Sequence, residues 1–230
     1  LMKSYAKKGV EFLLGSKVTA VTDTEVIYDG GRVIADKVLL SIGRRAATEG
    51  IGLENIGSAL DRGAIITDKH CLTNIPNIYA VGDVNGKYML AHTAYREAEV
   101  AVNNILDKKD IMRYNAISSV IYTNPEVACV GETEETAKQK GIEYEVSNIS
   151  MMYSGRYVAE TSDNDGICKV LIHKKYRHVI GVHMIGSYAS EMIYGAAMMI
   201  ETQMRVDDIK EFVFPHPTVS EIIREAIFKL

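Results

Sequence analysis

A continuous apolar segment sets the strongest limit on the fold of the first part of the chain. Residues 37–42 run Lys-Val-Leu-Leu-Ser-Ile and are followed at once by Gly43-Arg44-Arg45. A short segment without a polar face is typical of a strand that is covered on both sides of a sheet, as in layered α/β proteins. We therefore expect residues 37–42 to form a buried strand that stops at Gly43.

The residues around this segment indicate a mixed α/β fold. Further short strands are expected at residues 17–21, 25–28, 65–67 and 78–81. Asp29-Gly30-Gly31 predicts a hairpin turn after the second of these strands. Residues 90–106 place apolar side chains at helical spacing and predict a helix.

The second half of the chain has a different order of elements and begins near a charged break, Asp107-Lys108-Lys109-Asp110. Strands are expected at residues 118–122, 127–130, 144–150, 166–173 and 179–185. Helices are expected at residues 134–141, 190–201, 206–212 and 219–229. Strands followed by segregated helices indicate an α+β layer. The sequence thus predicts an α/β part followed by an α+β domain.

Composition narrows the class of partner. Lys and Arg number 26 against 30 Asp and Glu, a net charge of −4, whereas nucleic-acid binders normally have a basic excess. No apolar run approaches the roughly 20 residues that span a bilayer, and the first residues contain no apolar signal region. We expect a cytoplasmic protein without nucleic-acid or membrane partners.

Three cysteines, Cys71, Cys129 and Cys168, lie far apart in the sequence. They form no close pair, and no Cys/His cluster has the spacing of metal ligands, so no metal site is expected. We interpret each cysteine as a small hydrophobic residue. Any redox-active thiols that the protein needs must then come from elsewhere.

The segment Phe-Pro-His-Pro-Thr-Val-Ser-Glu at residues 214–221 has two interpretations. Thr218 and Glu221 fit a capping box, in which the Thr side chain bonds a helical N–H and the Glu side chain reaches back. Alternatively, the prolines hold His216 beside the helix start, where Glu221 orients the ring and stabilises the imidazolium. A histidine that transfers protons near neutral pH needs such a partner.

Three shorter motifs are compatible with a nucleotide-like ligand. Gly82-Asp83 follows a predicted strand and can place a carboxylate against a ribose or ribityl hydroxyl, although a plain turn explains it equally. Met89-Leu90-Ala91-His92 lies at a predicted helix start, where backbone N–H groups favour an anion. Gly43-Arg44 ends the apolar strand and lets a ligand approach the backbone, or is a solvated loop.

In this order and at these intervals, the motifs resemble the carboxyl-terminal half of the flavin-dependent pyridine nucleotide-disulfide oxidoreductases. The dihydrolipoamide dehydrogenase branch is the most similar, because Met89-Leu90-Ala91-His92 distinguishes it from glutathione reductases. Two further matches are Tyr-Thr-Asn-Pro-Glu-Val-Ala at residues 122–128 and Gly-Val-His-Met-Ile-Gly at residues 181–186. The resemblance covers essentially the whole chain.

The resemblance implies three parts and two cofactors. Residues 1–45 would be the tail of an NAD-binding domain, residues 46–110 the second part of an FAD-binding domain, and residues 111–230 an interface (dimerisation) domain. The FAD site would use Asp83 for the ribityl chain and, for the flavin, the backbone around Met89, Leu90, Ala91 and His92. The NAD site would use Gly43, Arg44 and Val18.

The resemblance also implies the reaction and the partners. Protein-bound dihydrolipoamide would be oxidised, with electrons passing through a Cys pair and FAD to NAD; His216 would be the base and Glu221 its orienting partner. The family architecture implies a homodimer in which each His serves the partner's flavin. The lipoyl group would belong to a protein of a 2-oxo acid dehydrogenase or glycine cleavage complex. For the dimer, the apolar helix around residues 192–200 is expected to divide evenly between core and interface.

Two features depart from the family pattern. The chain contains no Gly-rich fingerprint of the GxGxxG type and no close cysteine pair, and Pro215 occupies a position where the family usually has a small residue. Two alternatives therefore stay open: a catalytically inactive dimerisation module, and part of another flavin disulfide reductase.

We predict that the 230-residue chain alone does not oxidise dihydrolipoamide, because Cys71, Cys129 and Cys168 cannot supply a redox pair. The measurement is NAD⁺ reduction by the purified chain with dihydrolipoamide and added FAD. Turnover above the rate without protein would contradict the prediction.

Overall fold

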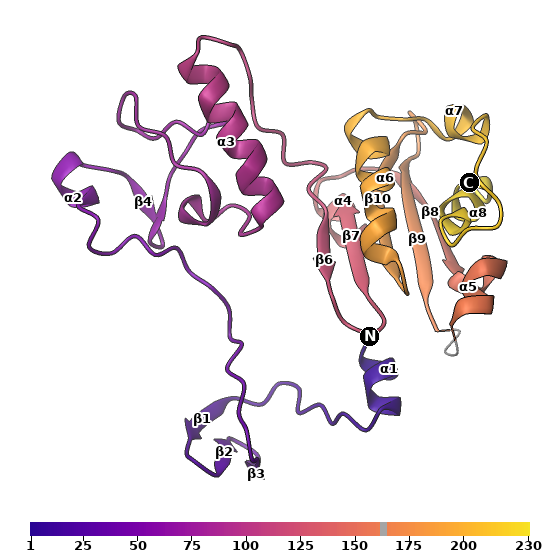
Figure 1. The fold of residues 1–230 in the computed structure, drawn as a ribbon, viewed down its shortest axis with the longest axis horizontal. Coiled ribbons are helices and arrows are strands. Elements are labelled where there is room, and N and C mark those ends of the chain that lie inside the picture. Colours follow the sequence, from indigo (N-terminus) through magenta and orange to yellow (C-terminus); the bar gives the residue numbers. More distant parts are fainter. Residues whose placement is uncertain (162–164) are drawn as a thin grey trace. The chain divides into compact units, whose positions relative to one another are not determined.

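The structure is a computed structural model that describes residues 1–161 and 165–230 (Figure 1). Backbone contacts divide the chain into two units. One contains residues 1–10 and 114–230, and the other contains residues 11–113. Both units mix helices and strands, which confirms the predicted fold class.

The unit of residues 114–230 is built on a five-stranded antiparallel sheet of order β6-β7-β10-β9-β8. The strands are β6 (Ser119–Ile121), β7 (Val127–Gly131), β8 (Tyr144–Ser150), β9 (Ile167–His173) and β10 (Val179–Ile185). All five predicted strands form. Val182 of β10 lies between Val130 and Val170 of its two neighbours, and all three are buried. Such cross-strand apolar rows fix the register of a sheet.

Helices pack against this sheet. They are α4 (Glu134–Gln139), α5 (Gly155–Glu160), α6 (Ala189–Glu201), α7 (Val206–Lys210) and α8 (Glu221–Phe228), and the short α1 (Met2–Lys7) joins the same unit. Helices α5 to α8 share one core cluster with Val170 of β9, whereas Glu134 of α4 pairs with Lys169, whose side chain lies on the other face of the sheet. Helix α6 crosses β7 and β10, while α8 packs on β9 and β8 (Figure 1). The four predicted helices form with ends within two residues. The sequence did not predict α5, whose single turn and a half is too short for a periodic pattern.

The apolar side of α6 belongs mainly to the core of its own unit. Met192, Ile193, Ala196 and Ile200 are buried there, and Ala197 and Met199 are partly buried against the same cluster. An even division between core and interface was therefore wrong for these positions. Tyr194 and Met198 are the large apolar side chains of α6 that stay exposed.

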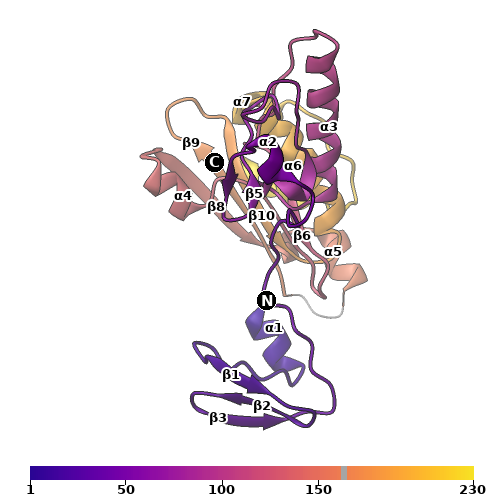
Figure 2. The same cartoon turned by 90° about the vertical axis from the view of Figure 1, so that its left-hand side faces the viewer.

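The unit of residues 11–113 contains a small sheet and a long helix. Strands β1 (Val18–Val21), β2 (Glu25–Tyr28) and β3 (Gly31–Ile34) pair antiparallel, with the predicted turn between β2 and β3 (Figure 2). The predicted helix is α3 (Ala91–Ile105). The remaining elements are α2 (Leu53–Ile56), β4 (Leu60–Asp61), β5 (Ala64–Ile65) and the 3₁₀ turn η1 (Gly82–Asn85).

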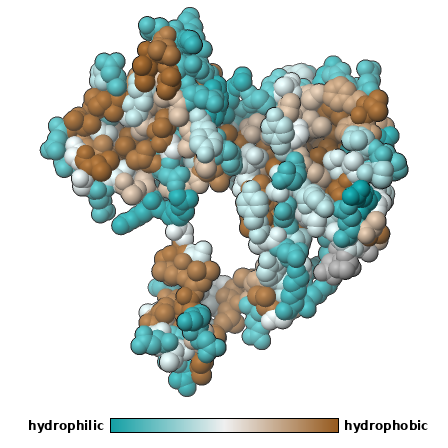
Figure 3. Space-filling view, in the orientation of Figure 1, coloured by the Kyte–Doolittle hydropathy of each residue, from teal (hydrophilic) through white to brown (hydrophobic). Residues whose placement is uncertain are grey.

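Two predicted strands of this unit are wrong. Residues 37–42 form no strand, and Leu39 is 90% exposed and Ile42 is 86% exposed. A strand requires a hydrogen-bonded neighbour, and no strand within residues 1–161 and 165–230 pairs with this segment. Residues 78–81 form only a single bridge between Leu72 and Tyr79 for the same reason. Figure 3 shows brown, hydrophobic surface over the β1–β3 part of the unit.

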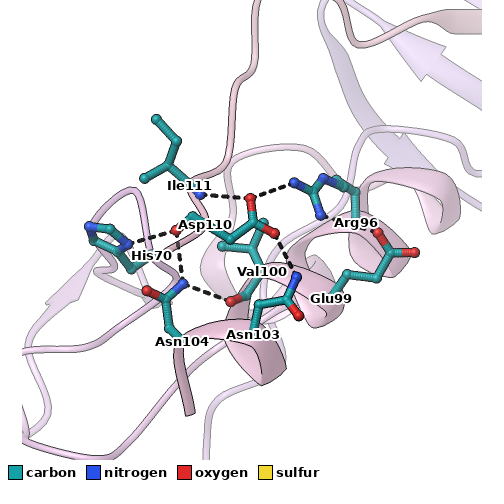
Figure 4. A network of polar contacts seen from close by, with 8 residues as sticks. All are labelled: His70, Arg96, Glu99, Val100, Asn103, Asn104, Asp110 and Ile111. Atoms are coloured by element: carbon teal, nitrogen blue, oxygen red, sulfur yellow. Dashed lines mark hydrogen bonds and ion pairs between the residues drawn. The ribbon is translucent and has the colours of Figure 1, made fainter. Parts of the chain in front are cut away.

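A polar network fixes the chain where it leaves α3 (Figure 4). The carboxylate of Asp110 accepts hydrogen bonds from Arg96 at 2.7 Å and from Asn103 at 2.8 Å. The Asp110 carbonyl accepts from the Asn104 amide at 2.9 Å and from His70 Nδ1 at 2.8 Å. The Arg96 hydrogen bond, followed by that of Asn103, lowers the pKa of Asp110 from 3.8 to about 2.

This lowered pKa predicts an acid-dependent contribution to stability. The contribution is complete above the ordinary pKa of 3.8 and is lost as the pH falls through the folded-state pKa near 2. The stability difference between the parent chain and Asp110→Asn should therefore shrink between pH 4 and pH 2. Urea unfolding across that range measures it. Asp107→Asn, a change in the same connection, should show no such convergence, and a constant difference for Asp110→Asn would contradict the assignment.

Candidate cofactor and acid–base sites

His216 and Glu221 meet at the start of α8. His216 Nδ1 lies 2.7 Å from Glu221 Oε1, and the imidazole is 79% exposed. An ionised carboxylate only accepts hydrogen bonds, so the hydrogen of this pair is on Nδ1. The other ring nitrogen, Nε2, is then the basic atom and points into the open. The predicted contact between the two side chains therefore forms, and the catalytic role of the pair stays a prediction.

Glu221 also holds the backbone of the loop. Its Oε2 accepts the N–H of Thr218 at 2.9 Å. This hydrogen bond, followed by that of His216, lowers the pKa of Glu221 below its ordinary value, which keeps the carboxylate ionised. The capping-box prediction is correct for Glu221 and wrong for Thr218, because the Thr218 hydroxyl bonds the Pro215 carbonyl and Ser220 Oγ, each at 2.9 Å. Helix α8 starts three residues later, at Glu221, with no side-chain cap.

Gly82 and Asp83 form the first half of the turn η1. Gly82 has φ +78°, a conformation in which a larger residue is strained, and a Cβ there would lie in tight contact, 3.2 Å from Ala94 Cβ on α3. The carboxylate of Glu97 on α3 accepts the Gly82 N–H at 2.6 Å and the Asn85 amide at 2.8 Å. Glu97 thus holds both ends of the turn η1, which contains Asp83, against α3.

Sequence reasoning missed Glu97, which is fully buried. A signal existed, since Thr93, Glu97, Val100 and Ala101 form the buried stripe of α3. An acidic residue on the buried stripe of a helix needs hydrogen-bond donors opposite it. The pattern therefore indicated a nearby loop, although not which one.

The structure brings three of the predicted ligand residues together. Arg44 forms an ion pair with Asp83 and donates a hydrogen bond to the Met89 carbonyl at 3.4 Å. Arg44 and Met89 also line a cavity of about 550 Å³, together with Arg62 and Lys87. The cavity has a cationic lining, which suits an anionic ligand.

Leu90, Ala91 and His92 follow at the start of α3. Leu90 is the N-cap residue, no side chain caps the helix, and the first turn contains no acidic residue. The exposed N–H groups and the helix dipole therefore favour negative charge at this point. A partly exposed Asp83 carboxylate and this helix start fit the polyol chain and the flavin end of FAD.

The predicted NAD residues are only partly brought together. Gly43, beside Arg44, has φ +115° and open space at its Cβ position, so a ligand can approach the backbone there. Val18 lies on β1 with its side chain more than half exposed, and it does not line the cavity that Arg44 borders. Gly43 and Val18 are thus both accessible, and their role toward NAD stays a prediction.

The cysteines have no redox partner among the described residues. All three are free thiols, and burial raises the pKa of Cys71 to about 11 and that of Cys168 to about 12. Burial also raises the pKa of Cys129. A thiol with such a pKa is not nucleophilic at neutral pH. Across residues 1–161 and 165–230, no three His, Cys, Asp or Glu side chains are grouped to hold a metal, and no helix is long and apolar enough to cross a bilayer.

Two family models match the chain. Residues 1–98 match the pyridine nucleotide-disulphide oxidoreductase model, and residues 117–227 match the dimerisation domain of the same family. The chain belongs to the pyridine nucleotide-disulfide oxidoreductase family. The predicted resemblance is therefore confirmed, and the sheet of β6–β10 with its helices is the family's dimerisation domain.

Among curated relatives, dihydrolipoyl dehydrogenase of Chlamydia muridarum is 37% identical over 231 residues, covering 98% of this chain and 50% of the relative. The human mitochondrial dihydrolipoyl dehydrogenase is 40% identical over 232 residues, covering 96% of this chain and 45% of the relative. The chain spans about half the length of the curated relatives it matches.

Solved structures show the same fold. LpdA from Mycobacterium tuberculosis matches with a TM-score of 0.91 at 25% identity, over 99% of this chain and 51% of that chain. The HOCl-induced flavoprotein disulfide reductase RclA from Escherichia coli matches with a TM-score of 0.87 at 24% identity, over 99% of this chain and 54% of that chain. The second similarity is evidence of fold alone.

Glu97→Ala should destabilise the unit of residues 11–113, because it leaves the Gly82 N–H and the Asn85 amide without their acceptor. Each unpaired buried group costs about 1–3 kcal/mol. Urea unfolding and hydrogen exchange of the Gly82 amide measure the effect. Glu99→Ala on the same helix, which removes an exposed ion pair with Arg96, is the control and should cost under about 1 kcal/mol. Equal losses in the two variants would contradict the role of Glu97.

Proposed function

We propose that the chain is the carboxyl-terminal half of a dihydrolipoyl dehydrogenase. The enzyme would oxidise protein-bound dihydrolipoamide to lipoamide, with electrons passing through a Cys pair outside this sequence and FAD to NAD. The observation that carries the proposal is the His216–Glu221 pair, with Nδ1 bonded at 2.7 Å and Nε2 free to accept a proton. The names of the relatives support the substrate class.

His216 would act as the base. A thiolate and not a thiol attacks a disulfide, so the substrate thiol must lose its proton. Nε2 would take that proton, and Glu221 would stabilise the imidazolium through Nδ1–H. Glu221 is suited to this task because its lowered pKa keeps it charged.

The cofactor residues would act by binding and orientation. When bound, FAD would accept an electron pair from the thiols and deliver it to NAD. Asp83 would accept a hydrogen bond from the ribityl chain. The helix start at Met89, Leu90, Ala91 and His92 would stabilise negative charge on the flavin ring. Gly43, Arg44 and Val18 would border the NAD site.

The exposed apolar residues of the unit 11–113 support a larger enzyme. Residues 37–42 have the composition of a buried strand but no sheet neighbour in the described chain. We propose the division into residues 1–45, 46–110 and 111–230 given above, with the missing sheet neighbours supplied by the rest of the NAD- and FAD-binding domains.

The proposed partners are a second copy of the chain and a lipoyl-bearing protein of a 2-oxo acid dehydrogenase or glycine cleavage complex. The dimerisation-domain match supports the first.

A cytoplasmic location stays a prediction, since the relatives include mitochondrial enzymes. The alternative of an inactive dimerisation module is supported by the core cluster of that domain, whose buried members lie between residues 128 and 227. Flavin absorbance of the purified chain distinguishes the two.

In the full-length enzyme, His216→Gln should lower lipoamide turnover by about 10²–10⁴, the usual effect of a positioned acid–base group. Glu221→Gln should have a smaller effect, because it removes a partner and leaves the base in place. Steady-state kinetics with dihydrolipoamide measure both, and flavin absorbance shows that the cofactor is retained. Near-parental turnover of His216→Gln would show that His216 only completes a turn.

Residues 111–230 alone should fold and dimerise, because this segment holds the complete sheet and its core. Apolar side chains such as Tyr194 and Met198 stay exposed in the single chain, and burying apolar area stabilises by roughly 25 cal/mol per Å². Sedimentation at micromolar concentration is the measurement. A folded monomer would show that the dimer depends on residues outside this segment.

A further inference from the structure

Ser154 joins the helix α5 to the loop that carries His216. Its hydroxyl oxygen lies 3.0 Å from the Thr218 carbonyl oxygen, and the same oxygen accepts the N–H of Tyr157 at 3.2 Å as the N-cap of α5. Ser154 is only 1% exposed. Neither the motif around His216 nor the helix pattern of the sequence pointed to it.

The hydrogen bonds of Ser154 leave it no freedom. A serine hydroxyl has one hydrogen to donate, and a carbonyl can only accept, so that hydrogen is directed at Thr218. Thr218 in turn donates its N–H to Glu221 Oε2, while Glu221 Oε1 bonds His216 Nδ1. Hydrogen bonds on both sides of the Thr218 backbone thus connect α5 to the imidazole.

The surroundings of the loop make this contact important. Pro217, Thr218, Val219 and Ser220 border a cavity of about 320 Å³, which Arg156 and Tyr188 also line. A segment beside a cavity lacks van der Waals partners on that side, so packing restrains it less. Val219 packs in the core cluster, whereas Thr218 is held by hydrogen bonds, one of which comes from Ser154 in the protein interior.

We propose that Ser154 is a positioning residue for the His216–Glu221 pair. It fixes the carbonyl of Thr218, which limits rotation of that residue and keeps its N–H directed at Glu221. The carboxylate is then held where it sets the tautomer and orientation of the imidazole. The catalytic part of this inference rests on the proposed function, and the structural part does not.

The structural part is tested on the 230-residue chain with ¹⁵N-labelled histidine. In the parent, recorded at alkaline pH so that the imidazole is neutral, the His216 ring should give the two separated ¹⁵N signals of the Nδ1–H tautomer, assigned with His216→Gln. Ser154→Ala should bring these signals together as the tautomers mix, whereas Ser154→Thr, which keeps the hydroxyl, should retain the parental pattern. Ser150→Ala is the matched control, since Ser150 caps the neighbouring turn at Met152 and does not bond the loop.

Ser154→Gly is a second variant for the case that Ser154→Ala does not fold, because glycine is a tolerated N-cap and also lacks the hydroxyl. Parental ring signals in folded Ser154→Ala and Ser154→Gly would overturn the inference. The same shift in Ser150→Ala would overturn it too, because loss of any nearby cap would then suffice.

The catalytic part is tested in the full-length enzyme with dihydrolipoamide. Ser154→Ala should lower kcat about tenfold with little change in KM, as expected for a misplaced base. Ser154→Thr should return to within about twofold of the parent. Parental kcat in Ser154→Ala would overturn the positioning role. Absence of lipoamide turnover in the parent would instead refute the proposed function, and the ring signals alone would then decide the role of Ser154.

Discussion

The dimerisation domain depends on the close passage of two backbone segments at Gly131 and Gly181. A Cβ on Gly181 would lie 2.0 Å from the Glu132 carbonyl oxygen, and one on Gly131 would lie 2.2 Å from that of Ile180. Only glycine allows this approach, which also lets the Glu132 N–H bond the Ile180 carbonyl at 2.8 Å. Strand β10 can therefore pair on both edges and carry the apolar row on which α6 and α8 pack. Because α8 begins at Glu221, the position of the His216 loop follows from this sheet.

In each of the two units, a glutamate carboxylate accepts a hydrogen bond from the backbone of a nearby loop. Glu97 on α3 accepts the backbone N–H of Gly82, and Glu221 at the start of α8 accepts that of Thr218. In each case a helix holds a short loop that presents a polar side chain, Asp83 or His216. A backbone N–H that faces a carboxylate forms a charge-assisted bond, which is stronger than a neutral one. The loops can therefore be short and irregular and still hold a fixed geometry.

The sequence pattern predicted most helices and strands of the dimerisation domain correctly, but it failed for part of the unit of residues 11–113. Strands β6–β10 and helices α4, α6, α7 and α8 formed as predicted, because their neighbours lie within the same segment of chain. Residues 37–42 have an equally clear apolar pattern, yet a pattern states a preference for burial and cannot supply the partner that provides it. The His216–Glu221 contact was predictable from spacing near a helix start. Glu97 and Ser154 were not, since the groups that they bind, the Gly82 N–H and Asn85 side-chain amide for Glu97 and the Thr218 carbonyl for Ser154, belong to other segments of the chain.

The unit of residues 11–113 shows how a segment keeps local order without a complete sheet. Hydrogen bonds of polar side chains hold its loops: Glu97 accepts a hydrogen bond from η1, and Asp110, which follows α3, accepts hydrogen bonds from Arg96, Asn103 and His70. Hydrogen bonds of this kind are directional and need only two groups, whereas an apolar strand needs covering layers on both faces. The segment of residues 37–42 therefore stays exposed while the turns near α3 are defined. Asp83 and the start of α3, which belong to the proposed cofactor site, are therefore held in place within this chain. Residues 37–42, before Gly43, have no sheet neighbour among the described residues and are not held in this way.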